Sequence, residues 1–306
     1  MKIMRTRRKI VAAVMALGLG VSLAACGSDD DGGSDGGSSG GGSSDKSLTV
    51  GVIPSWTDYK SLGYLWKNVL EKDGYEVEIK EIPDNGPMYA AVAKGDIDVM
   101  ASSWPEVTQK QYWDKYQDDL EDLATWYDNA KLTMAVPKYS DISSIDELPD
   151  NADMFGGRIV GIEAGAGLTQ VMKDSVIPEY GLDEDFEFVT SSTTAMLAEL
   201  KKATDAKEDI VVTLWRPYWA NTAFPVKDLE DPKGAFGESE GLHVLARPGF
   251  SDDFPEVADM IGKAKLSDEQ YGSLEDLVAN KHEDDPAAGV TEWLKDNQDW
   301  VETLQG

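Results

Sequence analysis

Residues 48–56 read LTVGVIPSW, a run of small and β-branched side chains that ends in proline, serine and tryptophan. Such a run predicts a buried β-strand over residues 48–53. Apolar side chains then recur at the spacing of one helix face, and they are Leu62, Leu65, Trp66, Val69 and Leu70. A strand followed at once by a helix is the repeating unit of α/β proteins, whose sheets are mostly parallel.

The same alternation continues along the chain. A cap-like Ser192 precedes another helical pattern, in which Met196 and Leu200 share a face. No strand is predicted after about residue 247, and residues 267–270, SDEQ, read instead as a capping box that begins a helix. The predicted fold class is therefore α/β, with a helical C-terminus packed on an existing domain. Further strands are predicted over residues 76–82, 96–101, 132–136, 158–162, 187–189, 210–214 and 242–246.

Two turn-rich connections, at residues 137–149 and near residues 237–241, each adjoin a predicted strand. A two-lobed protein shows such connections when its chain crosses from one lobe to the other and back. We therefore expect lobe 1 over residues 47–137, lobe 2 over residues 138–241, and a return to lobe 1 over residues 242–306. Each lobe is expected to hold a mostly parallel sheet that is flanked by helices.

The N-terminus reads as an export signal. A basic segment is followed by an apolar run over residues 10–23, which is short for a membrane span. Residues 23–26, LAAC, resemble the lipobox of bacterial lipoproteins, in which the signal is cut before the cysteine and the cysteine carries lipid. We therefore expect a signal peptide over residues 1–25, lipid on Cys26, and a disordered Gly/Ser/Asp-rich linker over residues 26–46. The folded part is expected to be lipid-anchored at the extracytoplasmic face of the cell membrane.

Composition argues against several classes of function. Cys26 is the only cysteine, so neither an intramolecular disulfide nor a thiolate metal cluster can form. The formal net charge of −29 disfavours nucleic acid as a partner. His243 and His282 lack companions at metal-ligand spacing, so neither a metal nor another cofactor is expected. The sequence offers no positioned nucleophile or acid–base pair, and we therefore do not expect an enzyme.

Three of the nine tryptophans share one context. Trp56, Trp104 and Trp215 each lie at or just beyond the carboxyl end of a predicted strand, where open α/β sheets bind their ligands. A single tryptophan there is more often a packing residue, but three in equivalent places favour a binding site. Indole rings can surround a trimethylammonium group, which is bulky, weakly hydrated and without N–H donors. The pattern therefore predicts a site for a quaternary ammonium compound.

A glycine-rich turn indicates how the other end of such a ligand is held. Residues 158–162, RIVGI, form a predicted strand, and residues 163–167, EAGAG, lead into a helix that begins near Leu168. Such a turn presents free backbone N–H groups and the positive end of the helix dipole, which can hold a carboxylate. The turn half-matches a dinucleotide-binding loop, but its last position is Gln170. A tight turn without any ligand fits the sequence equally well.

Ten segments in order along residues 48–247 carry a resemblance to a known family. They are YLW at 64–66, GPMY at 86–89, AKGDID at 93–98, SWP at 103–105, VPKY at 136–139, SIDEL at 144–148, GAG at 165–167, AML at 195–197, IVVTLWRPYW at 210–219 and LEDPKG at 229–234. Together they resemble the glycine betaine/proline betaine-binding proteins of osmoprotectant ABC importers, the OpuAC-like family. The helical C-terminus matches only in a generic way.

The resemblance implies a two-lobed periplasmic-binding-protein fold of type II, with the ligand cleft between the lobes. It also implies an ABC permease in the membrane as the partner that receives the solute. The family's three-tryptophan cage corresponds to Trp56, Trp104 and Trp215, and holds the trimethylammonium group. The family's carboxylate site corresponds to the backbone N–H groups of Gly167 and Leu168.

One position departs from the family's pattern. A histidine a few residues past the second cage tryptophan commonly completes the carboxylate site, and Gln109 occupies that position here. Glutamine can donate an amide N–H but carries no positive charge. Trp219, four residues after Trp215, and Tyr59 are further candidates to support the cage.

The exact ligand stays open at this point, because choline, carnitine or another methylated onium compound fits the same cage. Choline lacks a carboxylate, so its binding would not depend on Gln109 or Gly167. A secreted enzyme on the same scaffold and a sensory lipoprotein are alternatives from other classes. Turnover of a ligand would favour the enzyme, and neighbouring permease and ATPase genes would argue against the sensor.

Overall fold

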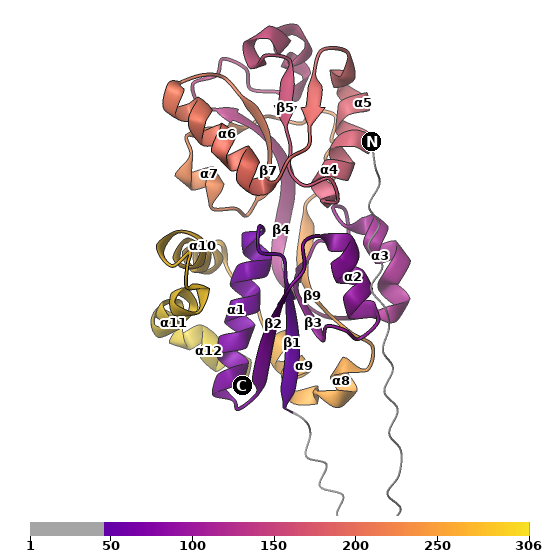
Figure 1. The fold of residues 1–306 in the computed structure, drawn as a ribbon, viewed down its shortest axis with the longest axis vertical. Helices are drawn as coiled ribbons and strands as arrows, with labels where there is room; N and C mark the ends of the chain where they lie inside the picture. The colour runs from indigo at the N-terminus through magenta and orange to yellow at the C-terminus, as the bar shows by residue number, and fades with distance from the viewer. Residues whose placement is uncertain (1–45, 306) are drawn as a thin grey trace, which may run out of the picture. The chain divides into compact units, whose positions relative to one another are not determined.

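The computed structural model describes residues 46–305 (Figure 1). The predicted signal peptide, the predicted lipidation at Cys26 and nearly all of the predicted linker lie outside these residues. Within residues 46–305, no helix combines the length and the apolar character that a membrane crossing requires.

Nine strands form one continuous sheet, which we divide into two lobes. The part in lobe 1 runs in the order β2 (Glu76–Glu81), β1 (Ser47–Val52), β3 (Val99–Ser103), β9 (Glu240–Ala246) and the first part of β4 (Glu121–Pro137). Strand β1 is parallel to both β2 and β3, whereas β9 is antiparallel to β3 and β4. The parallel core of lobe 1 therefore comes from the first strand–helix units of the chain, as the alternating sequence pattern predicts.

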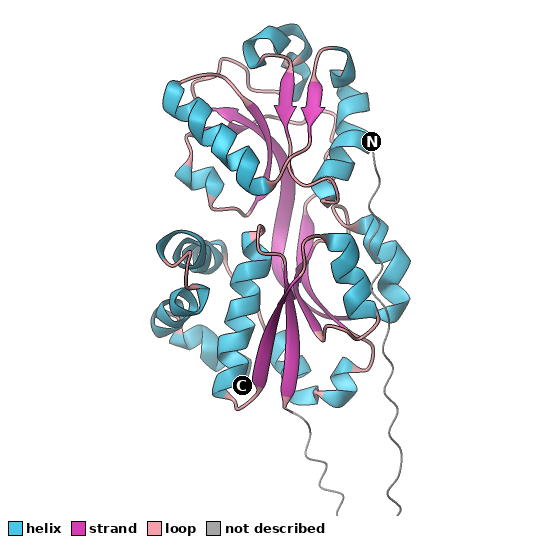
Figure 2. Ribbon diagram, viewed as in Figure 1, coloured by secondary structure: helices cyan, strands magenta, loops and turns pink. Residues whose placement is uncertain are grey.

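Helices cover the sheet of lobe 1, and Figure 2 shows them on both sides of it. The first of them, α1 (Thr57–Lys72), packs on β3 and on the C-terminal helix α11. The other helices of lobe 1 are α2 (Asn85–Ala93), α3 (Lys110–Tyr116), α8 (Phe250–Asp253), α9 (Pro255–Gly262), α10 (Asp268–Asp276), α11 (Pro286–Asp296) and α12 (Gln298–Gln305), with short 3-10 and π segments at Gln117–Asp119 and Leu277–Lys281.

Lobe 2 is built on the second part of the sheet. Strand β7 (Val211–Arg216) is parallel to β5 (Arg158–Val160), which is parallel to β6 (Glu187–Val189). Strand β8 (Val226–Asp228) pairs with the end of β4. The helices of lobe 2 are α4 (Gly167–Val171), α5 (Ile177–Tyr180), α6 (Thr193–Ala206) and α7 (Ala220–Ala223), with 3-10 and π segments at Ile145–Glu147, Pro149–Phe155, Met172–Val176 and Leu182–Glu184.

Strand β4 passes from one lobe into the other, as its long course in Figure 1 shows. It pairs with β9 as far as Ala130 and with β7 from Lys131 onward. The chain returns through β9, which begins at Glu240. All antiparallel pairs involve β4 or β9, so the strands that connect the lobes make the sheet more mixed than the sequence pattern indicates. The lobe boundaries proposed from the sequence stay predictions.

The α/β fold is confirmed, and the differences lie in particular strands. The strand expected at residues 132–136 begins at Glu121 instead. Its first residues are acidic, which lowers their strand propensity and hides them from the sequence pattern, but they pair with β9. Strand β8, with three residues, gave no recognisable alternation. The capping box at Ser267 is present, and Trp66 lies in the core as its helical spacing predicts. Trp293 and Trp300, on the C-terminal helices, are buried as well.

One core contact makes stability depend on pH. Glu275, on α10, is fully buried and accepts hydrogen bonds from the Thr57 hydroxyl at the start of α1 and from the Tyr271 hydroxyl, the latter at 3.1 Å. Burial raises the pKa of Glu275 from its ordinary value of 4.5 to about 8. The folded protein therefore holds this proton where the unfolded chain has lost it, and the free energy of unfolding falls as pH rises through this window.

We expect the free energy of unfolding to fall by about 1.4 kcal/mol for each pH unit between the unfolded and the folded pKa of Glu275. Glu275→Gln should flatten the profile, which urea unfolding between about pH 5 and about pH 9 will measure. Glu269→Gln removes an exposed glutamate from the same helix and serves as the control for the loss of one charge. An equally steep profile in Glu275→Gln would contradict this assignment.

Candidate functional site

The three tryptophans at strand ends line one cavity. Trp56 follows β1 and precedes α1, Trp104 follows β3 directly, and Trp215 is the penultimate residue of β7. Each is about 5 or 6 % exposed. Parallel strands bring their carboxyl ends to the same edge of a sheet, and the two lobes turn those edges toward each other. The chain thus gathers side chains that lie up to 159 residues apart in sequence.

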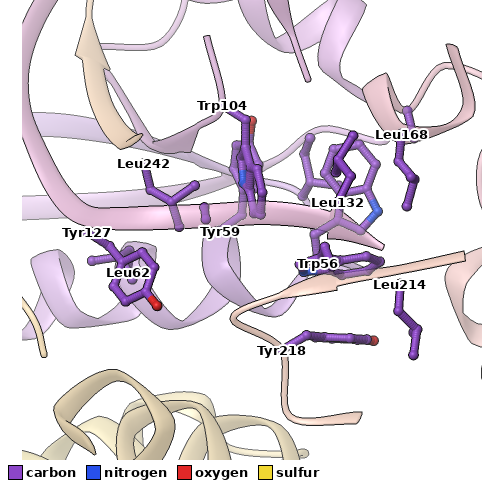
Figure 3. Packing of buried hydrophobic residues seen from close by; sticks show 14 of the residues in the cluster. Trp56, Tyr59, Leu62, Trp104, Tyr127, Leu132, Leu168, Leu214, Tyr218 and Leu242 are labelled. Carbon is purple, nitrogen blue, oxygen red and sulfur yellow. The ribbon is translucent and has the colours of Figure 1, made fainter. Parts of the chain in front are cut away.

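The cavity encloses about 360 Å³ of space, part of it continuous with solvent. Trp56, Trp104, Leu132 and Leu168 line it, and Figure 3 shows how these side chains lie. No lysine or arginine among residues 46–305 lines it. The remaining lining residues are Asp58, Asn85, Thr108, Gln109, Ile162, Ala166, Gly167 and Trp215.

A buried carboxylate orients Trp104. The indole Nε1–H of Trp104 donates to Oδ2 of Asp58 at 3.1 Å, and the Ser102 hydroxyl donates to the same oxygen at 2.8 Å. Burial raises the pKa of Asp58 above its ordinary value, and the hydrogen bonds from Trp104 and Ser102 oppose that rise. The Trp104 ring is therefore fixed at its edge, and the residue lines the cavity.

The Trp56 ring is held from the opposite lobe. Its Nε1–H donates to Oε2 of Glu163 at 3.3 Å, and Glu163 follows β5 in lobe 2. The same carboxylate accepts the backbone N–H of Thr193 at 2.9 Å and the Thr193 hydroxyl at 2.7 Å. Glu163 is thus tied to the start of α6, and it links a ring of lobe 1 to lobe 2.

Trp215 has an aromatic ring behind it. The Tyr218 ring stacks on it with centroids 4.0 Å apart and planes 21° apart. Trp219 contacts Tyr218 edge-on at 5.8 Å, one ring further from the cavity. The side-chain Nδ2 of Asn221 donates to the Trp215 carbonyl at 2.8 Å. Tyr218 therefore supports Trp215 directly, and Trp219, which the sequence suggests as a support of the cage, contacts Tyr218.

Gln109 lies at the start of α3 and is buried at the cavity wall. Its Oε1 accepts the backbone N–H of Trp104 at 3.1 Å and the hydroxyls of Ser103 and Tyr89 at 3.0 and 3.1 Å. Its Nε2 donates to the Tyr59 hydroxyl at 3.4 Å. The amide orientation is thereby fixed, with the oxygen used by the protein and one N–H left to donate. Tyr59 lies behind the lining and does not form it.

The glycine-rich turn leads into α4, as the sequence predicts. The first backbone bond of this helix runs from the N–H of Gln170 to the carbonyl of Ala166, at 3.2 Å. The N–H groups of Gly167 and Leu168 precede it and lie at the cavity, where a helix start leaves donors without partners. This turn also contacts lobe 1, since the Tyr112 hydroxyl donates to the Gly165 carbonyl at 2.9 Å.

Sequence reasoning missed three residues that line the cavity, namely Asp58, Asn85 and Thr108. Asp58 carried a usable signal, because an acidic residue two positions after a strand-end tryptophan also faces the end of the sheet. Among residues 46–305, no group of three or more histidine, cysteine or carboxylate side chains is placed to hold a metal ion.

A cavity lined by both lobes, at the strand ends of a two-lobed α/β sheet, defines a solute-binding protein of the type II periplasmic class. Residues 46–296 match the family described as "Substrate binding domain of ABC-type glycine betaine transport system". The chain belongs to this family, and the resemblance predicted from the sequence is confirmed. The family consists of solute-binding proteins.

Known relatives agree with this assignment. The chain is 34% identical over 161 residues to the glycine betaine/carnitine transport binding protein GbuC of Listeria monocytogenes, covering 52% of this chain and 53% of that protein. The alignment thus spans about half the length of that curated relative. The structure of the glycine betaine/L-proline-binding protein ProX from Borrelia burgdorferi is similar, with a TM-score of 0.79, 32% identity, and coverage of 84% of this chain and 96% of that one. An ABC-transporter choline-binding protein in complex with choline has a TM-score of 0.75 and 25% identity, with coverage of 85% and 91%.

Proposed function

We propose that the protein captures glycine betaine, or a closely related quaternary ammonium solute, outside the cell and delivers it to the permease of an ABC importer. The observation that carries the proposal is the convergence of Trp56, Trp104 and Trp215 on one cavity without a lysine or arginine in its described lining. Three indole faces attract a desolvated cation by up to about 2 kcal/mol each. A trimethylammonium group presents no N–H, so rings suit it better than a directional acceptor.

The ligand's carboxylate is assigned to the other end of the cavity. The N–H groups of Gly167 and Leu168 stand at a helix start, where backbone donors and the helix dipole attract an anion. The remaining N–H of Gln109 adds a donor from lobe 1. Gln109 stands where the resemblance implies a histidine in many relatives, so these groups bind the carboxylate without a full positive charge.

Ligand capture is proposed to draw the lobes together. Trp56 and Trp104 come from lobe 1, whereas Trp215 and the Gly167 turn come from lobe 2. Neither lobe alone completes the cage or the carboxylate site, so the bound solute favours the form in which both lobes contact it. The hydrogen bonds from Trp56 to Glu163 and from Tyr112 to Gly165 also join the two lobes and further stabilise this closed form. The permease would then distinguish the closed protein from the open one.

Choline is the second candidate, and Asp58 favours it. A buried carboxylate at the cavity wall attracts any cation, and it repels a ligand that carries its own carboxylate nearby. Choline has the same trimethylammonium group as betaine and no carboxylate. Burial raises the pKa of Asp58, so this preference for choline weakens as the pH falls.

We further propose that Cys26 carries the lipid that anchors the protein at the extracytoplasmic face of the membrane. The lipobox-like residues 23–26 and the glycine- and serine-rich residues that follow support this proposal. The anchor would keep the solute-binding lobes within reach of the permease. Radiolabelled palmitate incorporated by the wild-type protein and lost in Cys26→Ala would support it, and equal labelling of both would overturn it.

Isothermal titration calorimetry against a ligand panel tests the function. We expect saturable binding of glycine betaine and proline betaine, and weaker binding of choline, carnitine and ectoine. Glycine is the matched control, since it keeps the carboxylate and lacks the methyl groups, and it should give no heat of binding. Tighter binding of choline than of either betaine would favour the second candidate. No binding of any onium compound would reject the cage.

A further inference from the structure

The loop that joins β3 to α3 carries Trp104 at one end and Gln109 at the other, and both line the cavity. Between them, three consecutive backbone N–H groups point at one carboxylate. The N–H groups of Glu106, Val107 and Thr108 lie 3.2, 3.0 and 2.9 Å from the carboxylate oxygens of Glu240, and the Thr108 hydroxyl donates to it as well.

Successive backbone N–H groups that converge in this way form an anion-binding concavity. Glu240 fills it from within the chain, and its side chain is almost completely buried. A carboxylate accepts hydrogen bonds on both oxygens, whereas an amide of the same size turns an NH₂ group toward one set of donors. The loop conformation therefore depends on the chemical nature of Glu240 and not only on its volume.

The same loop meets the other lobe. A side chain added at Gly167 would place its Cβ 1.9 Å from the Thr108 carbonyl oxygen, so α4 approaches this loop as closely as its backbone allows. Three contacts of the site thus share one support, namely the Trp104 ring, the Gln109 amide and the approach of α4 to Thr108. A shift of this loop would move all of them at once.

Glu240 stands where the chain passes between the lobes. It is the first residue of β9 and pairs with Ala130 of β4, one residue before β4 leaves β9 for β7. A second bond of the same strand, from the N–H of Gly241 to the Glu106 carboxylate at 3.2 Å, ties β9 to the loop. The loop of the binding site is therefore fixed to the strands that connect the lobes.

We propose that Glu240 is a positioning residue for the ligand site, whose carboxylate holds the loop between Trp104 and Gln109 in the conformation that binds the solute. This inference rests on the proposed function for its ligand. Glu240 itself does not contact the solute in this proposal. It affects affinity through the positions of Trp104 and Gln109.

Glu240→Gln is expected to weaken binding of the preferred onium ligand by at least tenfold in calorimetry. Asp231→Asn is the matched control, because Asp231 also accepts two backbone N–H groups, from Ala235 and Phe236 at 3.0 and 2.8 Å, but does not line the cavity. Both variants should lose some thermal stability, and only Glu240→Gln should lose affinity. A purely structural role would lower the melting temperature of Glu240→Gln and leave its affinity at the wild-type value, which would overturn the inference.

A double-mutant cycle tests whether the effect passes through the loop. In the Trp104→Ala background, Glu240→Gln should cost a smaller fold loss of affinity than in the wild type, since one of the groups that it positions is gone. If the losses of affinity caused by the two substitutions were fully additive, Glu240 would not act through Trp104, which would overturn this part of the inference.

Amide hydrogen exchange supplies a readout that needs no ligand. In the unliganded protein, exchange at Glu106, Val107 and Thr108 should be faster in Glu240→Gln than in the wild type, and unchanged in Asp231→Asn. If the wild-type protein binds no onium compound, the proposed function fails. Amide exchange alone then tests whether Glu240 fixes the conformation of the loop. Unchanged protection in Glu240→Gln would overturn the positioning role.

Discussion

Replacing Trp104 with alanine is expected to weaken binding of glycine betaine by at least tenfold, and by up to about 30-fold if the ring contributes about 2 kcal/mol. The ring is 5 % exposed and lines the cavity, and Asp58 fixes its edge. Removing it takes away one of three cation-binding faces and admits water to the cavity. Calorimetric titration of the purified variant measures the effect.

Trp113→Ala is the control for this experiment. Trp113 is a half-buried tryptophan on α3 that packs against the core and does not line the cavity. It should alter stability with little change in affinity. Equal affinity of Trp104→Ala and the wild type would mean that the indole of Trp104 is a packing residue.

Gly167→Ala is expected to weaken ligand binding at least 100-fold, which is more than the loss caused by removing any single ring. The new Cβ would lie 1.9 Å from the Thr108 carbonyl oxygen and 2.6 Å from its carbon, both of them backbone atoms that cannot rotate away. Gly167 belongs to lobe 2 and Thr108 to lobe 1, so the clash opposes the approach of the lobes. The folding of each lobe should be preserved. Calorimetry combined with circular dichroism measures both quantities.

Gly272→Ala is the matched control. Gly272 lies in α10, and a Cβ there would meet no atom within 4 Å. This substitution should leave the affinity unchanged and raise stability by about 0.5–1 kcal/mol, as alanine does in a helix. Wild-type affinity in Gly167→Ala would contradict the close approach of α4 to the Thr108 loop.

The sequence predicts the fold well where patterns are local. Strand β1 and helix α1 follow from residues 48–70 because both periods are regular there. Strand β4 is different, since its first half is stabilised by pairing with β9, which lies more than 100 residues later in the chain. Tertiary pairing overrides the low strand propensity of Glu121 and Asp122, and no local pattern carries that information.

Part of the site could be predicted from the sequence, because it depends on where the strands end. Trp56, Trp104 and Trp215 stand at strand ends, and the α/β architecture brings strand ends together whatever the loops do. The support of these rings could not be predicted. Helical spacing points to Trp219 as the support of Trp215, but this segment is a turn, and Tyr218 stacks on Trp215. Glu240 lies 136 residues from Trp104, and its role depends on the path of β9.

If indole rings hold the positive charge of the ligand, one pair of ligands should be bound with very different affinities. In 3,3-dimethylbutanoate, a carbon replaces the nitrogen of glycine betaine, so shape and carboxylate are kept and the positive charge is lost. Calorimetry of both ligands against the wild-type protein should show glycine betaine binding at least 100-fold more tightly, as expected when rings contribute up to about 2 kcal/mol each. Equal affinity for the two would show that the cavity selects for shape alone, and would contradict the account.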